Sequence, residues 1–199
     1  MRRLVLASRN KGKINELREL LSGLPLEIVG LDQYPGAPEV AEAGKTFSEN
    51  AIIKAKAIGE YTGELTLADD SGLEVDFLNG EPGVYSARYG EPGWNDRQRY
   101  QYLLQKLQNV PHDRRQARFR SVVAVFDPGA GRLELAEGAV SGVIVDEPRG
   151  NQGFGYDPVF FLPEYQQTMA ELSAARKNDL SHRGRAIQAI MPRIQQMLV

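Results

Sequence analysis

A short apolar run at residues 65–68 is followed directly by two carboxylates, Asp69 and Asp70, and then by a Ser-Gly pair. A run of this length is typical of a buried strand. Strand side chains alternate between two faces, so a strand continuing through both residues would point Asp69 and Asp70 in opposite directions. Two buried, unpaired carboxylates would cost more free energy than such a strand end recovers. We therefore expect at least one to meet a cation, a donor-rich loop or solvent in a cleft, although an aspartate before Ser-Gly is also ordinary turn chemistry.

Composition limits the classes of protein that the chain can belong to. The 199 residues fit one large domain or a two-lobed one. With 24 basic and 26 acidic residues the net charge is -2, which gives no overall attraction to nucleic acid or anionic membrane. The absence of cysteine excludes disulfides, zinc–thiolate sites and thiol nucleophiles. The N-terminal apolar stretch is too short for a signal peptide and nothing approaches transmembrane length, so we expect a cytoplasmic protein with no membrane partner.

Hydrophobic periodicity predicts helices and strands that alternate at both ends of the chain, with a hairpin-rich middle. The expected strands cover residues 4–7, 26–30, 65–68, 73–77, 117–126 and 133–145, and the expected helices cover 11–21, 46–61 and 95–107. The capping-box pattern of Thr46 and Glu49 marks one helix start. Ser181 is a candidate cap for a final helix that Pro192 should kink. This order favours one α/β domain with a mixed sheet rather than a purely parallel one.

The loop at residues 8–13 lies between the first predicted strand and the first predicted helix. Such a loop presents free backbone N–H groups and the positive end of the helix dipole, which suits a phosphate. Lys13 would add a positive charge, and Ser8 and Asn10 would add hydrogen bonds. The segment matches neither a Walker sequence nor the glycine spacing of a Rossmann loop. A solvated helix N-terminus is therefore the alternative interpretation.

Glu42 precedes the second predicted helix and could share a metal ion with Asp69 or Asp70. Oxygen ligands of this kind suit magnesium. Lys54, on the same helix, could point back toward the acids. The alternatives are a solvated loop glutamate and a lysine that faces solvent.

Two later segments carry candidate groups for recognising a base. Residues 153–158 place two aromatic rings among glycines, where a ring can stack on a planar base and Asp157 can accept from a base edge. Further on, His182 and Arg183 put donors near a helix start. An aromatic-anchored turn and a helix cap are the competing interpretations. The basic segment 114–120 more simply forms the solvated face of a strand than a nucleic-acid site.

Six segments in order along the chain resemble the noncanonical purine nucleoside triphosphate pyrophosphatases, a HAM1-like family that cleaves ITP, dITP and XTP. They are residues 8–13, 42–55, 68–73, 82–89, 154–158 and 177–183. Together they extend over nearly the whole chain. Two departures are mild: Arg9 stands where a small residue is expected, and Pro192 lies in the last helix.

The resemblance implies a two-lobed α/β fold over residues 1–199, with a long mixed sheet, a central active-site cleft and a homodimer. The reaction would convert a nucleoside triphosphate and water to the monophosphate and pyrophosphate with Mg²⁺. Asp70 would accept the proton and, with Glu42, bind the metal, while Asp69 keeps a supporting role in holding the loop. The implied substrate-binding residues are Ser8, Arg9, Asn10, Lys11, Gly12, Lys13, Lys54 and Ser71 for the phosphates, and Phe154, Gly155, Tyr156, Asp157, Lys177, His182 and Arg183 for the base and sugar.

The chemistry of the substrates agrees with these roles. Inosine and xanthine carry a 6-oxo group, which donors such as His182 or Arg183 would favour over the amine of adenine. Three alternatives stay open. They are a related pyrophosphatase for pyrimidine or modified nucleotides, a nucleotide-binding regulator without turnover, and an RNA-binding module, which the net charge disfavours.

Overall fold

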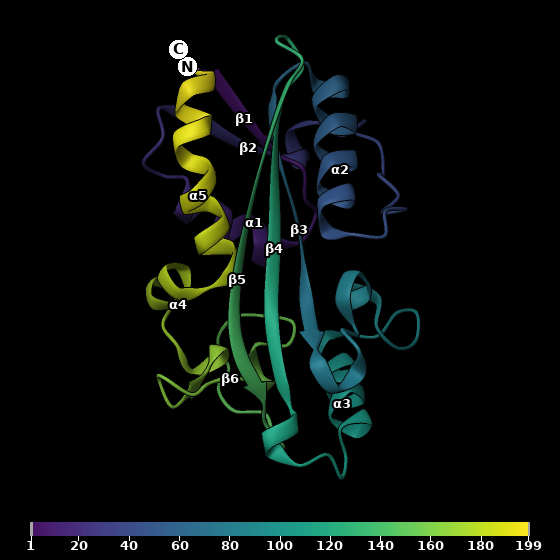
Figure 1. The fold of residues 1–199 in the computed structure, drawn as a ribbon. Helices are drawn as coiled ribbons and strands as arrows, with labels where there is room; N and C mark the ends of the chain where they lie inside the picture. The colour runs from purple at the N-terminus through teal and green to yellow at the C-terminus, as the bar shows by residue number, and fades with distance from the viewer. Residues whose placement is uncertain (1, 199) are drawn as a thin grey trace. The chain divides into compact units, whose positions relative to one another are not determined.

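The computed structural model describes residues 2–198, and the terminal residues of the predicted domain, Met1 and Val199, lie outside this range. Within it, seven strands form one sheet in the order β2-β1-β3-β4-β5-β6-β7 (Figure 1). The strands are β1 (Arg2–Leu6), β2 (Leu26–Gly30), β3 (Leu65–Val75), β4 (Gln116–Asp127), β5 (Arg132–Ile144), β6 (Phe160–Leu162) and β7 (Gln167–Thr168). The helices are α1 (Lys11–Leu20), α2 (Phe47–Thr62), α3 (Asp96–Lys106), α4 (Ala174–Leu180) and α5 (His182–Met197).

The sheet is mixed, as the order of predicted elements indicated. Strand β1 runs parallel to β2 and β3, whereas β5 and β6 and then β6 and β7 pair antiparallel. Within the described part of the chain, no helix is long and apolar enough to cross a bilayer.

The chain divides into two compact units. Unit 1 consists of Met1–Asp70, Ser121–Gly138 and Arg183–Val199, and unit 2 of Ser71–Arg120 and Ala139–His182. Strands β3, β4 and β5 each pass from one unit to the other partway along their length. No linker sequence separates the units, because three boundaries fall inside strands and the fourth falls after the first residue of α5.

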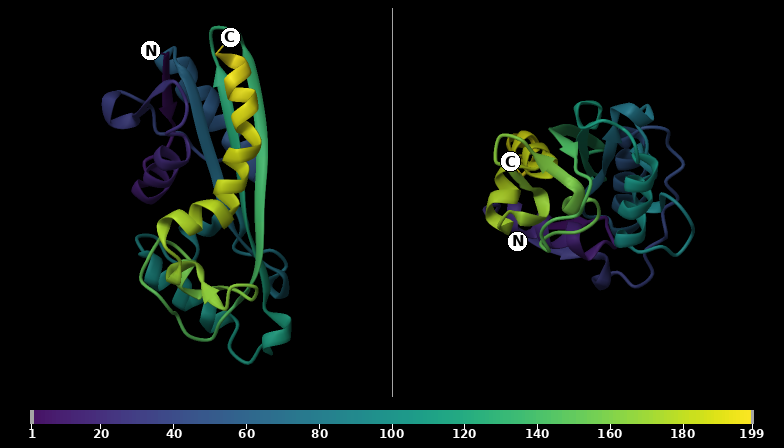
Figure 2. Two further views of the ribbon diagram at one scale, coloured as in Figure 1. Left: turned by 90° about the vertical axis from the view of Figure 1, so that its left-hand side faces the viewer. Right: turned by 90° about the horizontal axis from the view of Figure 1, so that it is seen from below.

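In unit 1, helices α1 and α5 bury their apolar faces on one side of the sheet. Leu17 and Leu21 from α1 meet Leu65 and Leu67 of β3 in one core cluster. Helix α5 adds residues at helical spacing, with Ile187, Ile190 and Ile194 in the same cluster. Figure 2 shows α5 lying along the Ser121–Gly138 hairpin.

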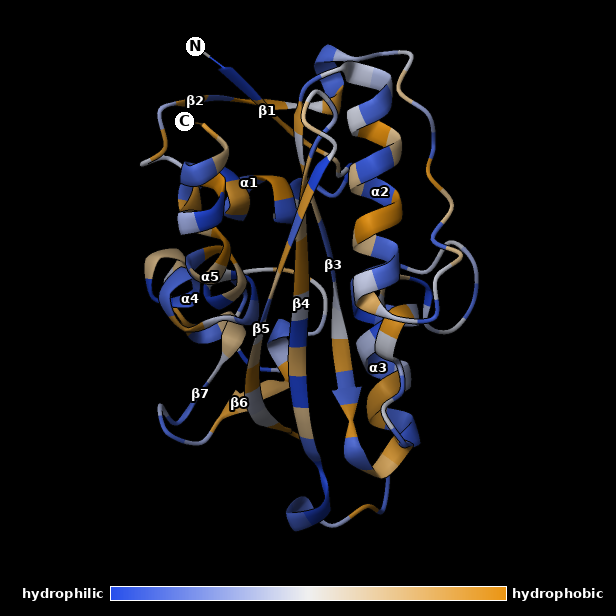
Figure 3. Ribbon diagram, turned by 45° about the horizontal axis from the view of Figure 1, so that its top comes forward, coloured by the Kyte–Doolittle hydropathy of each residue, from blue (hydrophilic) through white to orange (hydrophobic). Residues whose placement is uncertain are grey.

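Helix α2 also belongs to unit 1 and buries a face of mostly small residues. Polar and apolar residues alternate along it, as expected of a helix with one buried side (Figure 3). A Cβ on Gly59 would lie 2.7 Å from a ring carbon of Phe126, so the absence of a side chain permits this close approach. The helix starts at Thr46, whose hydroxyl accepts from the N–H of Glu49. Glu49 itself binds the N–H of Lys45, rather than completing the predicted capping box.

Unit 2 has its own apolar core. Leu103 and Leu107, from α3 and its C-terminal end, pack in a cluster with Leu73, Val75 and Phe160. Helix α3 starts with a reciprocal capping box between Asn95 and Gln98. The predicted helix over residues 95–107 is therefore confirmed, with Asn95 as its cap.

The prediction of two strands at residues 65–68 and 73–77 was wrong. A single strand, β3 (Leu65–Val75), continues through both aspartates. Burial of charge was expected to end the strand, but cations from other elements offset that cost. At the end of the chain, α5 passes through Pro192 without ending, and Ser181 closes α4, its N–H donating to the carbonyl of Lys177.

Candidate active site

The loop between β1 and α1 is organised by its own polar side chains. Asn10 caps α1, its Oδ1 accepting from the N–H of Lys13 at 3.1 Å. Ser8 Oγ accepts from the N–H of Asn10 at 3.2 Å, and the guanidinium of Arg9 donates to the carbonyl of Ala37. Lys11 is exposed and Gly12 is half-buried in the first turn of the helix. The predicted strand-to-helix loop is thus present. The side chain of Lys13 extends from it to β3.

Asp69 is the anchor for Lys13 and lies fully buried in β3. Its Oδ2 is 2.7 Å from Lys13 Nζ and 3.4 Å from a terminal nitrogen of Arg183, and its Oδ1 accepts from Ser121 Oγ at 2.5 Å. Burial acts to raise the pKa of Asp69, but Arg183 and Lys13 outweigh it and hold that pKa well below its usual range. Asp69 is therefore a fixed negative charge.

Asp70 binds a different set of groups, contributed by α2. Its Oδ2 accepts from Asn50 Nδ2 at 3.2 Å, and its Oδ1 lies 3.0 Å from Lys54 Nζ. Burial raises the pKa of Asp70 and Glu42 adds to the rise, while Lys54 and Lys13 oppose it. A carboxylate with a raised pKa is a better proton acceptor than an ordinary one.

The two aspartates thus point to opposite faces of β3, as strand alternation predicts. Asp69 contacts α1, β4 and α5, whereas Asp70 contacts α2. Both carboxylates meet a cation, so the expectation that at least one would do so is confirmed.

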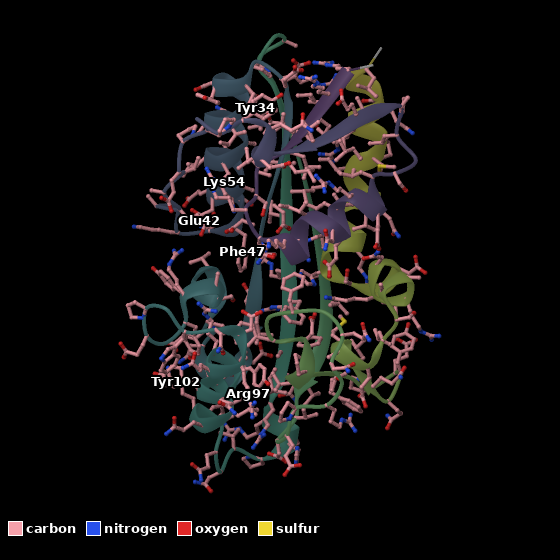
Figure 4. The ribbon with its side chains drawn as sticks, turned by 180° about the vertical axis from the view of Figure 1, so that it is seen from behind. Tyr34, Glu42, Phe47, Lys54, Arg97 and Tyr102 are labelled. Atoms are coloured by element: carbon pink, nitrogen blue, oxygen red, sulfur yellow. The ribbon has the colours of Figure 1, made fainter. Side chains whose placement is uncertain are left out.

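Lys54 joins Asp70 to Glu42 and so marks the candidate metal position. Its Nζ donates to Glu42 Oε1 at 2.8 Å, to Asp70 Oδ1 at 3.0 Å and to the backbone carbonyl of Asp69 at 2.8 Å (Figure 4 labels Glu42 and Lys54). The two carboxylates therefore converge on a single positive charge. Among residues 2–198, no three acidic or histidine side chains gather as a metal site. Magnesium is commonly bound by two carboxylates, with water and phosphate as the remaining ligands. The carboxylates of Glu42 and Asp70 therefore fit this ion.

In unit 2, the predicted aromatic segment forms a loop closed by an ion pair. Asp157 accepts from the N–H of Phe154 at 2.9 Å and from Lys177 Nζ at 2.5 Å. The same Nζ lies 4.7 Å from the centre of the Phe154 ring, in cation–π contact. A Cβ on Gly153, which has a φ of 74°, would lie 2.1 Å from the Asp157 carboxylate. The loop therefore requires glycine at this position.

Two anchors of this loop were missed by the sequence analysis. Asp96, in the first turn of α3, accepts from the N–H of Gly155 at 2.8 Å. The hydroxyl of Tyr156 donates to the backbone carbonyl of Ser86 at 2.8 Å. Tyr156 is buried, and burial raises the pKa of its phenol. A first-turn aspartate is ordinary helix chemistry, so the sequence carried no signal for the role of Asp96.

The last two predicted base-site residues face different environments. The ring of His182 stacks on Phe119 in unit 2, with centroids 4.8 Å apart and planes at 15°. Arg183 in unit 1 is 1% exposed and also pairs with the carboxylate of Glu16. Ser71 is half-buried in the unit 2 part of β3.

The structure therefore gathers the predicted site residues in two sets, one within each unit. The set in unit 1 is Ser8, Arg9, Asn10, Lys11, Gly12, Lys13, Glu42, Lys54, Asp70 and Arg183, and the set in unit 2 is Ser71, Phe154, Gly155, Tyr156, Asp157, Lys177 and His182.

Lysines and carboxylates beside a strand-to-helix loop are typical of α/β proteins that bind phosphate groups. Comparison with known families identifies the class more narrowly, because the model of the Ham1 family matches residues 4–193. The chain belongs to the Ham1 family, as the resemblance in its sequence predicted.

Relatives match this chain over nearly its whole length. A dITP/XTP pyrophosphatase of Desulforamulus reducens is 52% identical over 198 residues, which are 99% of this chain and 98% of that protein. A dITP/XTP pyrophosphatase of Geobacter sulfurreducens is 51% identical over 187 residues, covering 94% of each chain. The solved structure of a HAM1 protein from Coxiella burnetii has 40% identity and a TM-score of 0.89, covering 98% of this chain and 100% of its own. The predicted mixed α/β fold is thereby confirmed.

Proposed function

We propose that this chain hydrolyses the noncanonical purine nucleoside triphosphates ITP, dITP and XTP to the monophosphate and pyrophosphate, removing them from the nucleotide pool. The observation that carries the proposal is the environment of Asp70, a buried carboxylate with a raised pKa beside the Lys54 ammonium. Two relatives that bear the name dITP/XTP pyrophosphatase are 52% and 51% identical over 99% and 94% of this chain, and they support the same reaction.

In this proposal Asp70 accepts a proton from the attacking water. The water oxygen forms a bond to the α-phosphorus, and the bond from that phosphorus to the bridging oxygen breaks as pyrophosphate leaves. Negative charge then develops on the leaving group, where the ammonium groups of Lys13 and Lys54 stabilise it. The backbone N–H groups of residues 8–13 add donors for the phosphates.

Glu42 and Asp70 would hold a magnesium ion, since their carboxylates already converge on one positive charge. When bound, Mg²⁺ supplies further neutralisation of the triphosphate charge. Lys54 also binds the backbone carbonyl of Asp69, and this contact holds it in place to orient both carboxylates with or without the metal ion.

The base-binding role falls to the second set of residues. Phe154 offers a ring for stacking on a purine, and Lys177 and His182 supply donors suited to a 6-oxo group. Arg183 pairs with Asp69 and Glu16 through its two terminal nitrogens, and a guanidinium has further N–H donors for a base. We also propose that the protein acts in the cytoplasm as a homodimer. The absence of cysteine fits a reducing compartment, and light scattering tests the dimer.

A substrate panel tests the function. Pyrophosphate release is measured for ITP, dITP, XTP, GTP, dTTP and UTP, with Mg²⁺ and with a chelator. The expected result is Mg²⁺-dependent turnover with preference for the first three. A preference for pyrimidine nucleotides would support the rival pyrophosphatase, and tight ITP binding without product would support a regulator. A contaminating activity is excluded when the Asp70→Asn protein, purified in the same way, shows greatly reduced turnover.

A further inference from the structure

Residues 81–89, which we call the brace, lie in unit 2 and contact the aromatic loop at residues 153–158. We propose that Ser86, in this brace, is a positioning residue, which fixes the aromatic loop to strand β3 and thereby favours a purine base over a smaller pyrimidine base. The inference rests on the proposed function, because it takes the aromatic loop to hold the base.

Ser86 connects β3 to the aromatic loop through a single residue. Its side-chain oxygen accepts from the backbone N–H of Leu73 in β3 at 2.9 Å and donates to the carbonyl of Gly83 at 2.6 Å. Its own backbone carbonyl accepts from the hydroxyl of Tyr156 at 2.8 Å. Ser86 is 7% exposed and Tyr156 is 5% exposed, so water cannot readily replace either partner. Two buried hydrogen bonds therefore link the strand to the loop.

The brace is itself fixed along β3. The N–H of Val75 donates to the carbonyl of Glu81 at 3.1 Å, and the N–H of Gly80 donates to the carbonyl of Val75 at 3.0 Å. The bond from Leu73 to Ser86 adds a third contact two residues earlier on the strand. Backbone groups of β3 that would otherwise need a strand partner are thus satisfied by the brace and the turn before it.

The two ends of the brace are joined to each other and to α3. Tyr89 donates to Glu81 Oε2 at 3.0 Å, and Lys106 Nζ in α3 donates to the same oxygen at 2.8 Å. The Lys106 ammonium also lies 5.0 Å from the centre of the Tyr89 ring, in cation–π contact. Because the brace is closed on itself and bound to both a strand and a helix, Ser86 presents its carbonyl at a fixed position.

A fixed aromatic loop favours a substrate of one length. Ser71, which is assigned to the phosphates, lies two residues before Leu73 on β3. Ser86 therefore sets the distance from this part of the strand to the Phe154 ring, and a nucleotide must span that distance to stack. Uracil carries an oxo group next to a ring N–H, as hypoxanthine does, but it has one ring instead of two. Since hydrogen-bond donors alone discriminate poorly between these bases, the fixed distance supplies the discrimination.

Two specificity ratios test this role. The ratio of kcat/KM for ITP over UTP measures selection for the ring system, and the ratio for ITP over ATP measures recognition of the 6-position. Both are determined for Ser86→Ala, for Tyr156→Phe and for the double variant. The ITP/UTP ratio should fall by about 10-fold in each single variant through the loss of a buried hydrogen bond. The ITP/ATP ratio should be unchanged, because both bases are purines.

Two controls separate this effect from general damage to the protein. Inorganic tripolyphosphate carries no base, and it should inhibit every variant as it inhibits the wild type. Tyr165→Phe, at a half-buried tyrosine of unit 2 that contacts Arg176, also removes one phenolic hydroxyl and keeps the ring. Both of its ratios should equal those of the wild type.

The double variant shows whether Ser86 acts through Tyr156. If it does, the ITP/UTP ratio of the double variant should equal that of the more affected single variant, because the second change removes no further link to the loop. Effects that multiply would show that the two residues act independently, and this result would overturn the proposal.

Two further outcomes would contradict the proposal. One is a wild-type ITP/UTP ratio in Tyr156→Phe, which decides the matter even if Ser86→Ala fails to fold. The other is a fall of the ITP/ATP ratio by the same factor, since the anchor would then not select for base size. A wild-type protein without turnover would refute the proposed function alone, because calorimetric affinities for ITP and UTP in the same variants still test the anchor.

Discussion

Each unit contains an ion pair between a lysine and a buried aspartate, and the two pairs have different surroundings. In unit 1, Lys13 and Asp69 are 2.7 Å apart, and Arg183 brings a second positive charge to the same carboxylate. In unit 2, Lys177 and Asp157 are 2.5 Å apart, and the same carboxylate accepts from a backbone N–H of its own loop. The first pair concentrates charge contributed by several elements, whereas the second shapes one loop.

The exposure of the two lysines follows the same division. The Lys13 side chain is 16% exposed and that of Lys177 is 5% exposed beneath the ring of Phe154. Only a cation with some exposure can bind a phosphate without losing its partner. The same lysine–aspartate pair therefore suits a phosphate group in unit 1, and a planar base beside the Phe154 ring in unit 2.

The largest effect is expected at Asp70, beside the charged cluster of unit 1. Asp70→Asn removes the proton acceptor, so kcat should fall by about 10²- to 10⁴-fold while ITP affinity is largely retained. Pyrophosphate release and calorimetric binding measure the two quantities. Asp32→Asn, at an exposed aspartate of the same unit, is the control. A near-normal rate in Asp70→Asn would refute its assignment.

The ion pair of unit 2 should respond in stability. Lys177→Met leaves Asp157 buried without its ammonium partner, and the free energy of unfolding should fall by about 3–5 kcal/mol. The double variant Lys177→Met with Asp157→Leu should recover much of that loss, because no lone charge is then buried. Urea unfolding monitored by tryptophan fluorescence gives both values. If Lys177→Met and the wild type have equal free energies of unfolding, the Lys177–Asp157 pair does not stabilise unit 2, and the contrast with the pair of unit 1 is wrong.

A smaller effect is expected from Asp96, which supports the aromatic loop from α3. Asp96→Ala removes the acceptor of the Gly155 N–H, a loss of about 1–2 kcal/mol. The loop should then hold a base less well, and kcat/KM for ITP should fall several-fold while tripolyphosphate inhibits as before. Asp113→Ala, at an exposed aspartate of unit 2, should leave both unchanged. A loss of tripolyphosphate binding in Asp96→Ala would argue that the two sites are not separable.

The helix caps should give the smallest effects, one in each unit. Thr46→Ala removes the cap of α2 and Asn95→Ala that of α3, and each should lower the free energy of unfolding by about 1 kcal/mol. The same urea measurement applies. Thr46→Ser and Asn95→Asp keep a capping oxygen and should stay close to the wild type. If Asn95→Ala lowers the free energy of unfolding as much as Lys177→Met does, the effect of Lys177→Met is not specific to its ion pair.

The sequence predicted most of the fold because local signals were strong. The turn at residues 128–131 separated two long apolar stretches, and β4 and β5 begin and end within one residue of the predicted strands. The continuation of β3 through Asp69 and Asp70 was not predictable, because the compensating charges come from Lys13 and Arg183, far away in the sequence.

The candidate site shows the same limit. The alternation of Asp69 and Asp70 followed from strand geometry, and the cost of burial predicted that at least one of them would meet a cation, a donor-rich loop or solvent. Residue type alone could not show that Arg183 is buried and pairs with two carboxylates. Asp96 likewise gained its role only through the fold, which brings it to Gly155, 59 residues away along the chain.

The continuity of β3 has a consequence for how this chain can vary. A deletion or insertion of one residue between Leu65 and Asp69 would exchange the two faces of the strand. The proton acceptor would then meet Arg183, and the anchor of Lys13 would meet Lys54. This segment should therefore accept conservative replacements far more readily than any change in its length, and a scan of single-residue insertions and deletions would find it among the least tolerant parts of the protein.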